Sequence, residues 1–128
     1  MRVEHIAVWT KDIERLAGFY EKYFGGKRNL KYRNESKGFE SYFITFDSGS
    51  SRLEIMNIVD LAGNDSGINA VGYTHLAFST GSKDSVVEMT EKLRDDGYKV
   101  LSEPRTTGDG YFESVVLDPD GNIVELTV

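Results

Sequence analysis

The sequence contains an internal repeat: one pattern of residues occurs twice. This repeat limits the chain to a fold built from two similar modules. His5-Ile6-Ala7-Val8 is matched by His75-Leu76-Ala77-Phe78, an offset of 70 positions between the two histidines. Glu54 is matched by Glu125 at an offset of 71. A repeated unit of this size exposes a sheet face that it cannot bury alone, so each copy needs a partner.

Each copy is predicted to run strand, helix, strand, strand, strand, because segments of alternating apolar residues surround one segment with apolar residues three and four apart. The pattern predicts an α+β fold in which two βαβββ modules form a curved mixed sheet. We expect a first module at 1–58, a linker at 59–71 and a second module at 72–128.

The expected elements can be placed by their caps and turns. Helices are predicted to begin after Thr10 or Asp12 and after Ser82, and to end at Gly25-Gly26 and Gly97. A loop is expected at 102–110, which contains Pro104, Gly108 and Gly110. The expected strands are Val3–Trp9, Asn29–Arg33, Phe39–Asp47, Arg52–Ile58, Gly72–Ser79, Tyr98–Leu101, Tyr111–Leu117 and Ile123–Val128.

Composition excludes several classes of protein. The 128 residues include no cysteine, which rules out disulfides and thiolate metal sites. The net charge is -6, and the last 64 residues carry twelve acidic against five basic side chains, so nucleic acid is a poor partner. No apolar run approaches the ~20 residues of a membrane helix, and the N-terminal residues lack the plan of a signal peptide. We therefore expect a cytoplasmic protein without nucleic-acid or membrane partners.

Side-chain parity brings four chemically active residues to one side of the predicted sheet. Successive residues of a strand point to opposite faces, and the more apolar set of each strand should face the helices. Those sets are Ile6/Val8, Leu53/Ile55, Leu76/Phe78 and Val124/Leu126. The opposite face of the same strands then carries His5, Glu54, His75 and Glu125, which include the only two histidines of the chain.

Two imidazoles and two carboxylates in this arrangement are typical of a metal site. A lone strand histidine is more often hydrogen-bonded, and a lone strand glutamate is more often solvated. Together, two neutral histidines and two ionised glutamates carry a charge of about -2, which a divalent cation neutralises. Such N and O ligands suit Ni²⁺, Co²⁺ or Zn²⁺, with Fe²⁺ or Mn²⁺ as alternatives. An octahedral ion would keep two positions open for water or substrate.

Several motifs resemble the vicinal oxygen chelate superfamily, which includes glyoxalase I, the bleomycin-resistance proteins and extradiol dioxygenases. The resemblance covers the whole chain. The motifs are the two His-x-Ala strands that begin at His5 and His75, Asp12 with Phe19-Tyr20 and Phe24-Gly25, Leu53-Glu54-Ile55, and Asp118-Pro119-Asp120-Gly121-Asn122 followed by Glu125-Leu126.

The ligand order His, Glu, His, Glu is similar to that of glyoxalase I, and Glu54 separates it from members with other residues at that position. The resemblance implies a metal-dependent lactoylglutathione lyase-like enzyme. It would convert a hemithioacetal of a thiol and methylglyoxal into a 2-hydroxyacyl thioester through an ene-diolate held by the metal. Glu125 would be the catalytic base, and Glu54 could share its work. The alternatives are another activity of the superfamily (epimerase, dioxygenase or thiol transferase) or a bleomycin-resistance-like binding protein.

The resemblance also implies a small-molecule substrate and a homodimer whose sites are shared between chains. Candidate substrate-binding residues are Trp9, Arg52, Met56, Asn57, Tyr73 and Tyr111. Two of them depart from the bacterial glyoxalase I pattern. Trp9 stands where an arginine usually contacts glutathione, and Asn57 follows Glu54 by three positions where the family asparagine usually follows by four.

Overall fold

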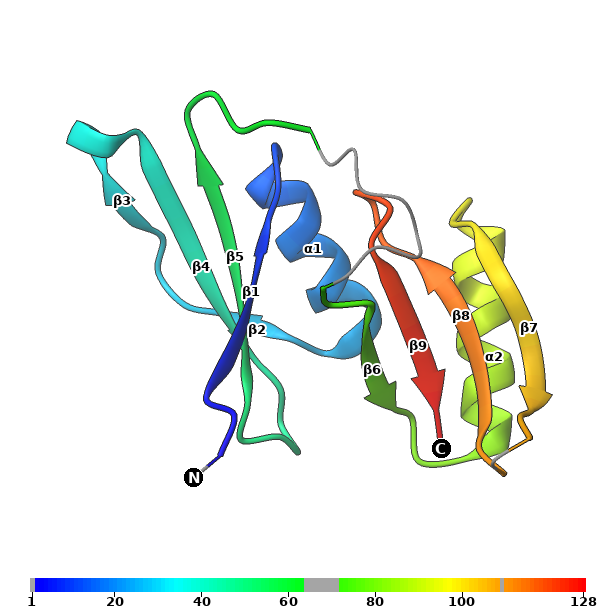
Figure 1. The fold of residues 1–128 in the computed structure, drawn as a ribbon. Coiled ribbons are helices and arrows are strands. Elements are labelled where there is room, and N and C mark those ends of the chain that lie inside the picture. Colours follow the sequence, from blue (N-terminus) through cyan, green and yellow to red (C-terminus); the bar gives the residue numbers. More distant parts are fainter. Residues whose placement is uncertain (1, 64–71, 109) are drawn as a thin grey trace. The chain divides into compact units, whose positions relative to one another are not determined.

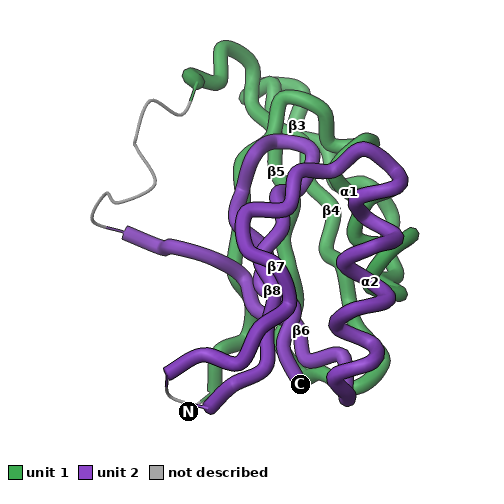
Figure 2. Tube along the Cα trace, turned by 90° about the vertical axis from the view of Figure 1, so that its right-hand side faces the viewer, with its two compact units in different colours: residues 1–64 green, residues 65–128 purple. Residues whose placement is uncertain are grey.

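A computed structural model describes residues 2–63, 72–108 and 110–128 as two compact units, which divide the chain between Asn64 and Asp65 (Figures 1 and 2). Residues 64–71 of the predicted linker lie outside the described residues. Each unit has one helix packed on its own mixed sheet. Neither helix within the described ranges has the length and apolar character needed to cross a membrane.

Unit 1 forms a sheet in the order β1-β5-β4-β2, and β3 also pairs with β4. Its β1 and β5 are parallel, and the remaining pairs are antiparallel. The parallel pair brings the first and last strands of the unit side by side. The elements in order are β1 (His5–Trp9), α1 (Ile13–Phe24), β2 (Lys27–Arg28), β3 (Tyr32–Asn34), the short 3₁₀ helix η1 (Glu35–Lys37), β4 (Phe39–Thr45) and β5 (Arg52–Ile58).

Unit 2 repeats this topology with the sheet order β6-β9-β8-β7. Its first and last strands, β6 and β9, are again parallel neighbours, and the other pairs are antiparallel. The elements are β6 (His75–Ser79), α2 (Lys83–Asp95), β7 (Val100–Thr106), β8 (Phe112–Leu117) and β9 (Ile123–Thr127). The predicted βαβββ order is thus present in both units, with β2 and β3 together in the place of the second strand of unit 1.

The strands expected from Val3, Gly72 and Tyr98 begin later, at His5, His75 and Val100. Two larger differences lie at sheet edges. Residues 102–106, expected in a loop, belong to β7, which tolerates Pro104 because it pairs only with β8 and because its register shifts between Ser102 and Arg105. The single strand expected at Asn29–Arg33 is wrong: β2 and β3 flank Asn29 instead. The Asn29 side-chain oxygen accepts a hydrogen bond from the backbone N–H of Phe43 at 2.8 Å, so the side chain takes over part of the pairing with β4.

The helices begin and end where their capping residues predict. Asp12 caps α1 by accepting from Arg15 N, and Ser82 caps α2 by accepting from Ser85 N. Gly25 ends α1 at φ 65°, a left-handed conformation that favours glycine. At Gly26 a Cβ would lie 2.5 Å from Cγ2 of Ile44, so the chain passes too close to β4 for any side chain.

The cores lie between each helix and its sheet. One polar contact lies within that of unit 2, where the hydroxyl oxygens of Thr90 and Ser114 are 2.7 Å apart and both residues are fully buried. The Thr90 hydroxyl donates to the Val86 backbone oxygen at 2.6 Å and accepts from the Ser114 hydroxyl, so the helix approaches β8 closely without an unpaired polar group at this point. The fully buried large apolar side chains are Leu16, Tyr20, Ile44 and Ile55 in unit 1, and Val86, Leu93, Val116, Val124 and Leu126 in unit 2.

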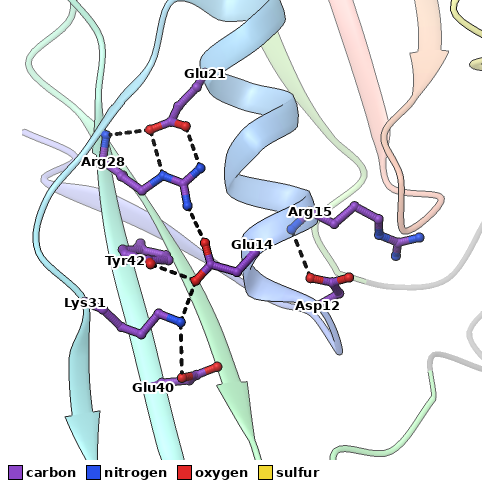
Figure 3. A network of polar contacts seen from close by, with 8 residues as sticks. All are labelled: Asp12, Glu14, Arg15, Glu21, Arg28, Lys31, Glu40 and Tyr42. Carbon is purple, nitrogen blue, oxygen red and sulfur yellow. Dashed lines mark hydrogen bonds and ion pairs between the residues drawn. The ribbon is translucent and has the colours of Figure 1, made fainter.

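An ion-pair network joins α1 to the chain between β2 and β4 (Figure 3). The Glu14 carboxylate accepts from the Tyr42 hydroxyl at 2.8 Å, and it lies 2.7 Å from Arg28 Nη1 and 2.5 Å from Lys31 Nζ. Glu21 accepts from Nε and Nη2 of the same arginine at 2.8 and 2.6 Å. The helix α1 is therefore attached to the sheet by these ion pairs as well as by the apolar side chains that it buries.

Candidate functional site

The predicted metal ligands of unit 1 lie on neighbouring parallel strands. Glu54 of β5 stands opposite Ala7 of β1, and His5 is two positions before that alanine on the same face. His5 Nε2 is 3.7 Å from Glu54 Oε2. The imidazole is 40% exposed and the carboxylate 16% exposed, so the glutamate is the more enclosed member of the pair.

Unit 2 has an equivalent pair in the same register. Glu125 of β9 stands opposite Ala77 of β6, and His75 precedes that alanine by two positions. His75 Nε2 is 3.5 Å from Glu125 Oε2, with exposures of 40% and 18%. In both units the same ring nitrogen faces the same kind of oxygen, at nearly the same distance and burial.

The donors of each pair fit two ligands of one divalent ion. Donors that are each about 2.1 Å from an ion lie about 3.0 Å apart at an octahedral angle and about 3.4 Å apart at a tetrahedral angle. The observed separations of 3.7 and 3.5 Å need only a small contraction. Among the described residues no group of three or more His, Cys, Asp or Glu side chains could hold an ion. Each pair by itself therefore offers two donors.

Glu4 contacts the predicted ligand His5, although alternation along the expected strand Val3–Trp9 puts it on the opposite face; in the structure it precedes the first residue of β1. Its Oε2 is 2.5 Å from Nδ1 of His5, and its other oxygen accepts from Nη2 of Arg52. The hydrogen bond with His5, assisted by the one with Arg52, lowers the pKa of the Glu4 carboxyl. The sequence signal that marks it is an acidic residue directly before a predicted ligand histidine.

Phe43 completes the surroundings of His5. It stands opposite Glu54 on β4, and its ring meets the imidazole edge-on with centroids 5.4 Å apart. The Arg52 guanidinium lies over the face of this ring, with Cζ 4.0 Å from its centroid. Phe43 therefore contacts a predicted ligand directly.

The candidate substrate-binding residues of unit 1 fall on both faces of its sheet. Trp9 and Met56 are register partners on the face of Glu54, and Trp9 is 47% exposed with its ring edge-on to Phe39. Arg52 shares this face but is engaged by Glu4. Asn57 points to the opposite face, where its amide donates to the backbone oxygen of Thr10 at 2.7 Å. The structure therefore does not bring Asn57 together with the His5–Glu54 pair.

The candidate residues of unit 2 lie outside its strands. Tyr73 precedes β6 and is 99% exposed, and Tyr111 precedes β8 and is 59% exposed. Both are accessible, but no contact joins either of them to His75 or Glu125 in the described part of the chain.

Comparison with known proteins identifies both fold and relatives. The model of the Glyoxalase/Bleomycin resistance protein/Dioxygenase superfamily matches residues 2–126. Uncharacterized protein YqjT of Bacillus subtilis (strain 168) is 48% identical over 59 residues, which are 44% of this chain and 46% of that protein. Lactoylglutathione lyase GLX1 of Arabidopsis thaliana is 29% identical over 126 residues, which are 98% of this chain and 43% of that protein.

Among solved structures, glyoxalase I from Zea mays matches with a TM-score of 0.80 and 24% identity, covering 98% of this chain and 44% of that chain. The match confirms the predicted α+β fold with repeated βαβββ units. The chain spans less than half the length of the Arabidopsis thaliana and Zea mays proteins, and its match to YqjT covers 46% of that protein.

Proposed function

We propose, because this chain belongs to the Glyoxalase/Bleomycin resistance protein/Dioxygenase superfamily, that it is a metal-dependent lyase. Membership confirms the resemblance predicted from the motifs. The proposed substrate is the hemithioacetal of a thiol and an α-ketoaldehyde such as methylglyoxal, and the product is a 2-hydroxyacyl thioester. The observation that carries this proposal is the pair of equivalent His–Glu contacts at 3.7 and 3.5 Å.

The four ligands have complementary roles. When bound, a divalent ion supplies Lewis-acid stabilisation of negative charge on two adjacent substrate oxygens. His5 and His75 hold it through their Nε2 atoms, which already face the glutamates. Glu54 and Glu125 bring two negative charges that balance the ion. We expect Ni²⁺ or Co²⁺ to serve better than Zn²⁺, because they retain six-coordinate geometry more readily.

Proton transfer is assigned to the carboxylates. Glu125 takes the proton from the carbon that bears sulfur and returns it to the neighbouring carbonyl carbon, and Glu54 shares this work. The hydroxyl proton of the first carbon passes to the oxygen of the former carbonyl, which completes the product. The reaction is an isomerisation, so atoms and electrons balance without an oxidant or reductant. The 18% and 16% exposures of these two side chains support the role, because a partly enclosed carboxylate loses fewer transferred protons to water.

The rest of the substrate is proposed to contact exposed side chains near the ligands. Trp9 and Met56 share the face of Glu54, and Tyr73 and Tyr111 are accessible in unit 2. We also propose a cytoplasmic homodimer in which the first unit of one chain and the second unit of its partner complete one site. This arrangement would bring together four ligands, two from each unit.

The test is turnover by metal-reconstituted protein. The chain is stripped of metal, loaded separately with Ni²⁺, Co²⁺ or Zn²⁺, and supplied with methylglyoxal hemithioacetals of several thiols, including glutathione. Thioester formation is expected with at least one metal and thiol. Glu125→Gln should reduce turnover by about 10²-fold or more, as loss of a general base does. Glu88→Gln makes the same chemical change at an exposed site on α2 and should leave turnover unchanged.

Inactivity with every metal and thiol would reject the lyase. Oxygen uptake with a catechol would instead indicate a dioxygenase, and tight binding without turnover would indicate a binding protein. Equal activity of Glu125→Gln and the parent chain would reject Glu125 as the base while leaving the reaction itself in place.

A further inference from the structure

We propose that Glu4 is a positioning residue that fixes the tautomer and orientation of His5, and that Arg52 holds Glu4 in place for this role. The proposal rests on the proposed metal-binding function and adds a specific asymmetry between the two His–Glu pairs. It assigns Arg52 a role other than direct contact with substrate.

The His5 imidazole has the Glu4 carboxylate at one ring nitrogen, Nδ1, and the proposed metal position at the other, Nε2. Glu4 Oε2 is 2.5 Å from Nδ1, and Nε2 on the far side of the ring is 3.7 Å from Glu54 Oε2. An ionised carboxylate can only accept a hydrogen bond, so a neutral imidazole in this contact carries its proton on Nδ1. The lone pair is then on Nε2, directed toward Glu54, where a metal ion requires it.

Glu4 is itself fixed from two directions. Its backbone oxygen accepts from Arg52 N at 2.9 Å, and the preceding residue accepts from the Ser51 hydroxyl at 2.8 Å. Its second carboxylate oxygen accepts from Arg52 Nη2. The chain just before β1 is thus attached to the start of β5, and the carboxylate has one oxygen for Arg52 and one for His5.

Arg52 is in turn held by the aromatic ring that touches His5. Its guanidinium lies over Phe43, whose ring edge meets the imidazole. Among the described residues its Nε is the only buried side-chain nitrogen or oxygen without a hydrogen-bond partner. The guanidinium therefore gives up one hydrogen bond to keep the position from which it reaches Glu4.

The second pair lacks every part of this arrangement. The residue before His75 is Thr74, which has no carboxylate. Ile123 stands opposite His75 where Arg52 stands opposite His5, and Val115 stands opposite Glu125 where Phe43 stands opposite Glu54. The equivalence of the two units thus ends at the residues around the ligands, and only His5 is pre-organised by a carboxylate.

A role in stability alone explains this arrangement poorly. The Glu4 and Arg52 side chains are 48% and 35% exposed, and exposed ion pairs contribute little to folding. Partners that orient a ligand histidine, by contrast, change metal affinity by about 10- to 100-fold when they are removed.

The experiment combines metal titration with nitrogen NMR on the full chain. Titration with Ni²⁺ and Zn²⁺ should show about 10- to 100-fold weaker binding for Glu4→Ala. Glu4→Gln should lose less affinity, because its amide oxygen can still accept from Nδ1, and Arg52→Met should fall between the parent and Glu4→Ala. Thr74→Ala is the matched control before the other histidine and should bind as the parent does.

The NMR readout separates positioning from a general effect on the fold. In metal-free protein labelled with ¹⁵N-histidine, at a pH where the ¹⁵N shifts are those of neutral imidazole, His5 should have its proton on Nδ1. Glu4→Ala should shift His5 toward a mixture of tautomers and leave the His75 signals in place. Unchanged His5 signals and unchanged affinity in both Glu4 variants would overturn the proposal. If the parent chain binds no divalent ion, the metal-dependent function fails, whereas the tautomer result still supports or rejects the role of Glu4.

Discussion

Ala7 and Ala77 stand opposite Glu54 and Glu125, and their single methyl groups leave room beside each carboxylate. A larger side chain at either position would occupy the space next to the His–Glu contact. The same small residue therefore accompanies the same pair in both units. Such matched details favour a shared chemical role over two independent surface contacts.

The first residue-scale prediction concerns metal content. The parent chain should bind about one divalent ion per chain, since four ligands are supplied per site. His5→Ala and Glu125→Gln should each bind metal much more weakly, because each removes one donor from the set. Elemental analysis after dialysis measures this content, with Glu88→Gln as the control. Parent-like metal content in both ligand variants would show that the ion binds elsewhere.

Strand parity predicts residues within regular strands and fails just beyond them. His5, Glu54, His75 and Glu125 could be placed on one type of face because alternation and the repeat are both visible in the sequence. Asn57 shares its parity with Leu53 and Ile55, so alternation puts it on the face opposite Glu54, where its amide donates to the backbone oxygen of Thr10. Glu4 was missed because alternation along the expected strand Val3–Trp9 puts it on the face opposite His5. In the structure it precedes β1, and its contact with Arg52 depends on pairing between distant strands.

At the scale of elements, the same limit explains the edges of both sheets. Central strands such as β5 and β9 were placed almost to the residue, because their apolar alternation is strong. The edge strand β7 was predicted too short, because Pro104 indicates a loop unless a strand pairs on one side only. The division of the second strand of unit 1 into β2 and β3 depends on the side chain of Asn29, which no periodicity reveals.

The attachment of α1 to its sheet should depend on pH through Glu14. The Lys31 ammonium, the Tyr42 hydroxyl and the Arg28 guanidinium lower the pKa of this carboxyl from 4.5 to about 2. A carboxyl with a lowered folded-state pKa contributes stability above its unfolded pKa and loses it as the pH falls. Glu14→Gln should therefore destabilise the chain at pH 7, and the difference should vanish between pH 4.5 and about 2.

The expected loss of unfolding free energy in Glu14→Gln is modest, because the Glu14 side chain is 56% exposed. Solvent screening reduces such a contribution to about 1 kcal/mol or less, and high salt should reduce it further. Denaturant unfolding of the parent and the variant across this pH range measures it. Parallel stability curves for the two proteins, with no convergence at low pH, would contradict the role of the ion pair.

At the scale of the whole molecule, the proposed function requires that the two ligand pairs meet. Under this proposal each unit supplies one imidazole and one carboxylate. An ion with four protein ligands therefore needs both a first unit and a second unit at the same site. A closed twofold dimer forms two such sites, because its symmetry pairs the first unit of each chain with the second unit of the other chain. A monomer folded on itself would form one such site.

Complementation between inactive variants distinguishes these arrangements. His5→Ala and His75→Ala chains should each be inactive alone and are mixed under conditions that allow subunit exchange. In a shared-site dimer, each mixed dimer has one site with both histidines and one site with neither. About half of the dimers are mixed and each has one of two sites intact, so about a quarter of the parent activity should return. Mass spectrometry of differently labelled chains verifies exchange. No recovery after verified exchange would show that each site is built within a single chain, since two such chains cannot supply each other's missing ligand.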